Sequence, residues 1–207
     1  MEGRAYFQAS IIQRIRSWLK IYEQAMVNEQ SISASTLRHR ENKQISWRPP
    51  EEGWIQIQTD GSVISPTSKA VAGGLLRAFV CNLGACSITD AELKGAAEGL
   101  SLAWLMGFKK ILLNLDSMTA ISIINSGEDD HRHNLLANHI RELIDREWEV
   151  KVPHVYRESN FAADYLACIG HDFPFGTHPV DVSDPKLCSW LSYDVMGITH
   201  DRFVSMN

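Results

Sequence analysis

The chain has 207 residues, of which 44% are hydrophobic and 22% are charged, and it contains four cysteines. It is long enough to bury one good core and too short for two large domains. No apolar run approaches the roughly 20 residues that span a bilayer, and the first residues lack the apolar stretch of a secretory signal. The cysteines form no CxxC pair and have no histidine at zinc spacing. We therefore expect no membrane association and an intracellular protein with reduced thiols, in the nucleus or the cytoplasm.

Charge is divided unevenly along the chain. Residues 1–50 hold eight Lys/Arg and four Asp/Glu, a balance of +4, whereas the rest hold twelve and twenty-one, a balance of −9. An acidic domain repels a polyanion unless divalent metal neutralises its carboxylates, which is a first indication of a metal site. The leader could add phosphate contacts through a set of basic residues: Arg14, Arg16, Lys20, Arg38, Arg40, Lys43 and Arg48.

Residues 1–50 are predicted to be a basic amphipathic helix followed by a polar linker. Apolar residues recur at spacings of three and four between Phe7 and Met26, which is typical of one stripe on a helix. Residues 29–50 are polar and end in two prolines. The helix either packs against protein or, with the linker, contacts nucleic acid, and the sequence leaves both readings open.

Strand and helix signals alternate from Trp54 onwards. Strands are predicted at residues 54–59, 70–77, 79–82, 111–115 and 150–156. Helices are predicted after a Thr89–Glu92 capping box, up to a stop at Gly127, over residues 136–148, and after an N-cap at Ser159. This order predicts an α/β fold with a mixed five-stranded sheet, its first three strands antiparallel, and helices on both faces. The folded domain would span residues 51–172, and residues 173–207 would form an irregular C-terminal tail.

Four acidic residues are candidates for one cleft. Asp60 and Asp116 each close a predicted strand, and the carboxyl ends of parallel strands border the crevice where ligands bind. Glu92 and Asp164, in the early turns of two helices, could complete the ring. Carboxylates gathered in this way require hard cations, and two Mg²⁺ or Mn²⁺ ions roughly 4 Å apart can activate water and stabilise a leaving oxygen at a phosphate.

Each acid also has a purely structural explanation. Asp60 could be a turn residue, Glu92 a capping-box partner, Asp116 the anion at a helix N-terminus, and Asp164 a solvated helix position. The four acids taken together, in their settings and order, favour the metal site over these separate explanations.

The segments TDGS, AEL, LDS and RESNFAADYLA follow one another in the order that resembles type 1 ribonuclease H. The chain closely resembles the plant ribonuclease H-like domains derived from non-LTR retroelements, where the domain follows a reverse transcriptase. The resemblance implies an endonuclease that hydrolyses the RNA strand of an RNA–DNA hybrid with two Mg²⁺ ions, for which Mn²⁺ could substitute. Its catalytic and metal-binding residues would be Asp60, Glu92, Asp116 and Asp164. We expect a monomer, with a reverse transcriptase as a possible partner in cis or in trans.

The resemblance also implies contacts with the nucleic acid. Backbone groups at Gly61 and Ser62 would contact RNA 2′-hydroxyls, the feature that distinguishes RNA from DNA. Ser117 would help hold a backbone phosphate at a helix start, and Asn160 is a further candidate contact.

A basic side chain near the scissile phosphate would be either Arg157 or His154. Arg157 is favoured because it lies in an RE-x-N segment typical of members without the mobile histidine, whereas His154 falls inside a predicted strand. In the competing interpretation, Arg157 merely pairs with Asp164.

The resemblance departs from the family between the second and third strands. Arg77-Ala78 supplies no turn residue at positive φ, so these strands must be shortened or rearranged, and activity could be impaired. The alternative function is therefore a catalytically impaired retroelement remnant that acts only as a nucleic-acid-binding or structural domain. A DEDD-type exonuclease, which needs Asp-x-Glu on the first strand, and an integrase-type site, which ends on Glu, are both disfavoured.

Overall fold

The structure is a computed structural model that describes residues 40–65, 67–126 and 134–205. The chain divides into two units, one made of residues 1–43 and 201–207 and the other of residues 44–200. The predicted leader helix, most of the basic leader and the predicted helix stop at Gly127 lie outside the described residues. Within the described ranges, no helix combines the length and apolar character needed to cross a membrane.

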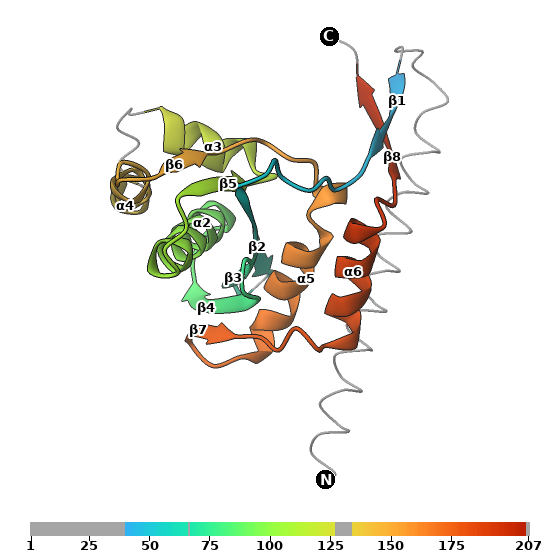
Figure 1. The fold of residues 1–207 in the computed structure, drawn as a ribbon. Coiled ribbons are helices and arrows are strands. Elements are labelled where there is room, and N and C mark those ends of the chain that lie inside the picture. Colours follow the sequence, from blue (N-terminus) through green and yellow to red (C-terminus); the bar gives the residue numbers. More distant parts are fainter. Residues whose placement is uncertain (1–39, 66, 127–133, 206–207) are drawn as a thin grey trace. The chain divides into compact units, whose positions relative to one another are not determined.

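The larger unit is built on a mixed sheet. Its strands are β2 (Ile55–Ile64), β3 (Lys69–Leu75), β4 (Phe79–Ala85), β5 (Lys110–Asn114), β6 (Glu149–Lys151) and β7 (Gly176–Pro179). They lie in the order β6-β5-β2-β3-β4-β7 (Figure 1). β2, β3 and β4 pair antiparallel, whereas β5 runs parallel to β2 and β6 parallel to β5. The predicted mixed sheet is confirmed, but it has six strands instead of five because β7 lies in the segment predicted to be irregular.

Two strands differ most in length from the prediction. β2 does not end before Asp60 but continues to Ile64, because its last residues pair with β3. β6 ends at Lys151, and only an isolated bridge between Leu115 and His154 follows it. The second half of the predicted strand at 150–156 is therefore wrong. Pro153 explains the early end, because it has no amide hydrogen to donate to a ladder.

The hairpin between β3 and β4 closes without a residue at positive φ. Gly74 pairs with Phe79, so residues 75–78 make the connection, and the positive-φ residues of the described chain all lie elsewhere. Such links are commonly built around a type I turn, which needs only negative φ. The Val180 amide donates to the carbonyl of Ala78 at 2.8 Å and ties this turn to the chain after β7. The pairing of β2 with β3 stays continuous through Asp60.

Helices cover both faces of the sheet, as predicted. α2 (Ile88–Leu105), α3 (Met118–Asn125) and α4 (Asn134–Ile144) pack on one face, and α5 (Phe161–Ile169) crosses the other over β2 and β3 (Figure 1). The core of the first face joins Ile57 of β2 to Leu93 and Leu100 of α2 and to Ile111 and Leu113 of β5, all with 0% exposure. Full burial of these large side chains contributes about 1.5–3 kcal/mol each, which fixes α2 against the central strands.

The C-terminal segment is not irregular in its described part. It contains β7, α6 (Pro185–Val195) and β8 (His200–Ser205). α6 begins at the N-cap Asp184, which is followed by Pro185. These two residues are a helix start signal, but the Pro and Gly content of the segment led to the prediction of an irregular tail. Asp184 also accepts a hydrogen bond from the Tyr165 hydroxyl of α5 at 3.0 Å, and Leu187 is fully buried, so α6 packs on α5. β8 pairs with β1 (Arg40–Ile45) in a separate two-stranded sheet, so part of the predicted linker is a strand.

Candidate active site

Asp60 lies within the central strand β2 and is paired with Gly73 of β3. Its side chain shares one face of β2 with Gln56 and Gln58, opposite Ile57, as the alternation of a strand predicts. Asp60 is only 4% exposed. Because β2 continues beyond it, the interpretation of Asp60 as a turn residue is wrong.

Glu92 is carried to the sheet by the start of α2. The N-cap of α2 is Ser87, whose hydroxyl accepts from the Asp90 amide at 3.1 Å and donates to the Asp90 carboxylate at 2.7 Å. The predicted capping box at Thr89 and Glu92 is therefore wrong, because the same spacing occurs two residues earlier. Glu92 has no part in the cap and is buried against the sheet, at 6% exposure. Gly61 permits this approach, since a Cβ there would lie 2.9 Å from the backbone nitrogen of Glu92.

Asp116 follows β5, the strand beside β2. The next residue, Ser117, is the N-cap of α3, and its hydroxyl accepts from the Ala120 amide at 3.2 Å. One carboxylate oxygen from each of Asp60, Glu92 and Asp116 lies within 4.8 Å of the other two. The structure thus brings together three of the four predicted acids in one cluster, which we call the acidic cluster.

Asp164 of α5 stands beside the acidic cluster and forms an ion pair with Arg157. The Asp164 side chain is 13% exposed and that of Arg157 is 49% exposed. α5 can pack so closely on the sheet because Gly73 has no side chain, and a Cβ there would overlap the backbone nitrogen of Ala167. The contact predicted by the competing interpretation of Arg157 is therefore present, but the charges of both Asp164 and Arg157 also act on Asp60.

Burial raises the pKa of each acid in the acidic cluster. At Asp60 the loss of water is the largest cause, followed by the charges of Glu92, Asp164 and Asp116, and the pKa lies well above its ordinary value. Burial and then the charge of Asp116 raise the pKa of Glu92 to about 8. Burial also raises the pKa of Asp116, against the opposing charge of Arg157. Burial is therefore the first cause of the raised pKa at Asp60, and repulsion between the acids comes second.

Two carboxylate oxygens of the acidic cluster, Glu92 Oε2 and Asp116 Oδ1, are buried and find no hydrogen-bond partner among the residues that the structure describes. Leaving a buried polar group unsatisfied costs about 1–3 kcal/mol, and more for a charged group. Hard divalent cations such as Mg²⁺ and Mn²⁺ take carboxylate oxygens as ligands. The donor set, made of oxygens alone, therefore fits such a cation.

Two buried polar side chains, Gln58 and Asn160, hold α5 against β2. Asn160, and not the predicted Ser159, is the N-cap residue of α5, while Ser159 belongs to the short 3₁₀ helix η2 (Arg157–Ser159). The Asn160 amide is fully buried and donates to the carbonyl of Thr59 at 3.0 Å. Gln58 donates to the carbonyl of Ser159 at 2.6 Å. The Asn160 amide thus anchors α5, and its predicted contact with nucleic acid stays a prediction. The polar side chain of Gln58 inside a central strand was the signal for this anchoring role.

His154 and Ser62 have neighbours that the sequence did not predict. His154 lies beyond β6, is exposed, and keeps only an isolated bridge to Leu115, while its charge acts on Asp116, so the preference for Arg157 over His154 stays a prediction. Ser62 Oγ lies 3.0 Å from His171 Nε2. Contacts of Gly61, Ser62 and Ser117 with a nucleic acid stay predictions.

Comparisons with known proteins agree with this architecture. The reverse transcriptase-like family model matches residues 58–169. An Arabidopsis thaliana protein provisionally named as a ribonuclease H protein is 32% identical over 176 residues, which cover 81% of this chain and only 28% of that protein. RNase H1 from the archaeon Halobacterium salinarum has a TM-score of 0.54 at 22% identity, covering 58% of this chain and 99% of that chain. LC11-RNase H1 in complex with an RNA/DNA hybrid has a TM-score of 0.52 at 17% identity, covering 56% and 96%. The chain has a ribonuclease H-like fold and belongs to the reverse transcriptase-like family.

Proposed function

We propose that this chain is a metal-dependent endonuclease that hydrolyses the RNA strand of an RNA–DNA hybrid. The observation that carries the proposal is the convergence of Asp60, Glu92 and Asp116, with two buried carboxylate oxygens that lack hydrogen-bond partners among the described residues. Support for the substrate comes from the structural neighbour LC11-RNase H1, which is bound to an RNA/DNA hybrid. The proposed product ends are a 3′-hydroxyl and a 5′-phosphate.

Asp60, Glu92 and Asp116 would hold a divalent cation, and Asp164 would join them in holding a second one. Two such ions supply an activated water and stabilise the leaving oxygen at the phosphate. The protein keeps the ligands in place through burial, since Asp60 is enclosed by the central strands and α2 carries Glu92 on a packed helix. An ångström of displacement can cost about 10²-fold in rate, so this rigidity is part of the proposed catalysis.

Arg157 would act on the substrate from the edge of the site. Its side chain is half exposed, while its charge reaches Asp60 and Asp116. A guanidinium binds phosphate oxygens in the same forked geometry as a carboxylate. We propose that Arg157 exchanges Asp164 for a phosphate oxygen of the RNA when the hybrid binds.

The proposed partner is an RNA–DNA hybrid, bound by a monomer. The match covers 28% of the Arabidopsis relative, so activities of the remainder of that longer protein are not carried over. A reverse transcriptase, in the same chain or as a separate protein, would be the source of the hybrid.

A cleavage assay tests this function. The purified chain would be incubated with an end-labelled RNA strand paired to DNA, with Mg²⁺, with Mn²⁺ or with EDTA, and the RNA fragments separated by length. We expect internal cuts with either metal and none with EDTA. Glu92→Gln should lower the rate by about 10²-fold or more, because it removes charge at the reacting centre.

The matched control is Glu98→Gln, which lies on the same helix and pairs with Lys94 at 2.9 Å, away from the acidic cluster. This variant should cut at the parent rate. Binding of the hybrid without any metal-dependent cleavage would instead support the alternative, a nucleic-acid-binding remnant. Equal cleavage of a DNA duplex would contradict the proposed substrate.

A further inference from the structure

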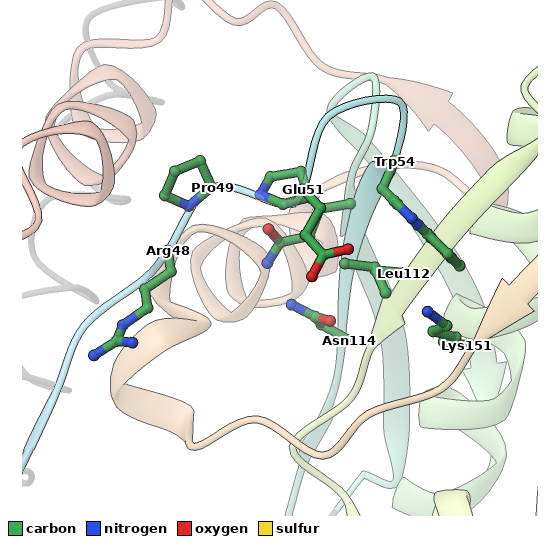
Figure 2. A pocket seen from close by; sticks show the side chains of 9 residues that line it. Arg48, Pro49, Glu51, Trp54, Leu112, Asn114 and Lys151 are labelled. Carbon is green, nitrogen blue, oxygen red and sulfur yellow. The ribbon is translucent and has the colours of Figure 1, made fainter.

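A second site lies on the sheet face that carries Asp60. A cavity of about 360 Å³ is bounded by residues 48–54 on one side and by β2, β5 and β6 on the other (Figure 2). Its volume falls within the range of roughly 300–1,000 Å³ that is usual for ligand pockets. We call it the strand-edge pocket.

The strand-edge pocket adjoins the acidic cluster. Gln56 pairs with Leu112, and Leu112 with Lys151, so three lining side chains form a row across three strands. Asn114 is the next lining residue along β5 on the same face, and Asp116 is the next position after it. Asp116 lies just past the end of β5, and two residues of chain span at most about 7 Å, so the pocket begins within that distance of a proposed metal ligand.

The lining groups suit a base and its phosphate. Figure 2 shows the carboxyl group of Glu51 directed into the pocket, with Leu112 and Asn114 facing it. A carboxylate recognises the amino and ring N–H groups of bases, and Leu112 provides an apolar surface for the ring. Lys151 lies at the opposite wall, with Nζ 4.0 Å from the centre of the Trp54 ring. Its ion pair with Glu149 spans 3.9 Å and is more than half exposed on both sides, which makes it weak.

Charge marks this pocket as a place where a polyanion can approach. Residues beyond position 50 carry a net charge of −9, and the acidic cluster itself repels phosphate until metal binds. At the strand-edge pocket, Lys110 and Lys151 both lie near the Trp54 ring, and Arg48 stands at the rim. A backbone phosphate would find counter-charge from Lys110 and Lys151 here without passing the acidic cluster.

We infer that the strand-edge pocket seats an unpaired nucleotide of the strand that lies across the acidic cluster. A base paired within a duplex presents only its edge, whereas a single-stranded base can enter a recess and be hydrogen-bonded there. Lys151 holds the phosphate of this nucleotide, while Glu51 accepts hydrogen bonds from its base and Leu112 contacts the ring. The path of the strand rests on the proposed function, but the binding of the nucleotide itself does not require catalysis.

The experiment compares three labelled hybrids in EDTA: one with blunt ends and two with two unpaired ribonucleotides, at the 5′ or at the 3′ end of the RNA. Fluorescence anisotropy gives each Kd. We expect one extension to tighten binding about tenfold, the worth of one charge-assisted contact. Lys151→Ala should remove this gain and lower the salt slope by about 0.7, as for one lost phosphate contact on a single strand. Leu112→Trp, which fills the pocket, should also remove it.

The matched control is Lys186→Ala, because Lys186 makes a comparable cation–π contact, 4.7 Å from the Trp190 ring on α6. This variant should keep the preference for the extension. Equal binding of all three hybrids by the parent protein, or an unchanged preference in folded Lys151→Ala, overturns the inference. Metal-dependent cleavage of the blunt hybrid is measured in parallel, so a failed inference with intact cleavage is distinguished from a failed nuclease.

Discussion

Without metal, the acidic cluster should destabilise the protein as pH rises, and Glu92 offers the clearest test. Its pKa of about 8 exceeds its ordinary value of 4.5, so the folded state prefers the protonated carboxyl. The corresponding stability is fully present below pH 4.5 and is lost as pH rises through about 8. The first cause is burial and the second is the charge of Asp116, and both act only when Glu92 is ionised.

The expected size follows from the pKa difference. At about 1.4 kcal/mol per pKa unit, a change from 4.5 to about 8 corresponds to roughly 5 kcal/mol of unfolding free energy. This is a large part of the 5–15 kcal/mol typical of a whole domain. Glu92→Gln cannot ionise, so it should reduce the pH dependence between these values, leaving the part that Asp60 and Asp116 contribute, and be more stable than the parent at pH 8. Mg²⁺ at about 100 times its Kd should return about 2.7 kcal/mol to the parent and less to the variant.

Urea unfolding followed by circular dichroism, at several pH values in EDTA and again in Mg²⁺, measures these differences. Glu98→Gln on the same helix is the control and should keep the pH dependence of the parent. A parent protein whose metal-free stability rises from pH 5 to 8 would refute the reasoning. So would a Glu92→Gln variant that is no more stable than the parent at pH 8.

Three further changes test separate parts of the structure. Asp116→Asn should reduce hydrolysis by about 10²-fold or more while the metal-free unfolding free energy holds or rises; unfolding of this variant would show that Asp116 is a structural residue. Gly73→Ala should cost about 3 kcal/mol or more in urea unfolding, because the new Cβ overlaps the backbone of α5; a near-neutral result would contradict the close packing. Arg157→Ala should lower the cleavage rate more than His154→Ala does. The His154→Ala variant should bind the hybrid in EDTA as tightly as the parent does. A larger loss of rate in His154→Ala would assign the helper role to His154.

Much of the fold follows from local patterns. The alternation in β2 and the continuous apolar run in β5 predicted the two strands that carry Asp60 and Asp116, because a half-buried and a fully buried strand leave different signatures. The lengths of the strands could be predicted less well from the sequence. β2 continues past Asp60 only because β3 pairs with it there, and β7 exists only because β4 offers an edge, so both depend on contacts distant in sequence.

The acidic residues could be predicted from their type and order in the sequence, but the contacts that hold them in place could not. Gln58 and Asn160 anchor α5 through backbone carbonyls, contacts between residues about a hundred positions apart that no local pattern encodes. The sequence therefore offered Asn160 only as a candidate contact with nucleic acid and gave no sign of its anchoring role. The capping box failed for a different reason: Ser87 and Thr89 both head an acceptable spacing, and only the packing of α2 decides between them.

Two glycines explain how a sheet and two helices can bring their acids together. A helix packed on a sheet is normally held away by the side chains between them, whereas the start of α2 and the middle of α5 approach β2 and β3 over Gly61 and Gly73. The first approach places Glu92 against Asp60, and the second places Asp164 beside it. Ionising these buried carboxylates lowers the stability of the fold, and a bound cation offsets that loss. The fold is therefore expected to be more stable with metal in this site than without it. The distances between the acids therefore depend on the absence of side chains at Gly61 and Gly73. The acidic residues can be recognised in the sequence by their type, but the distances between them cannot.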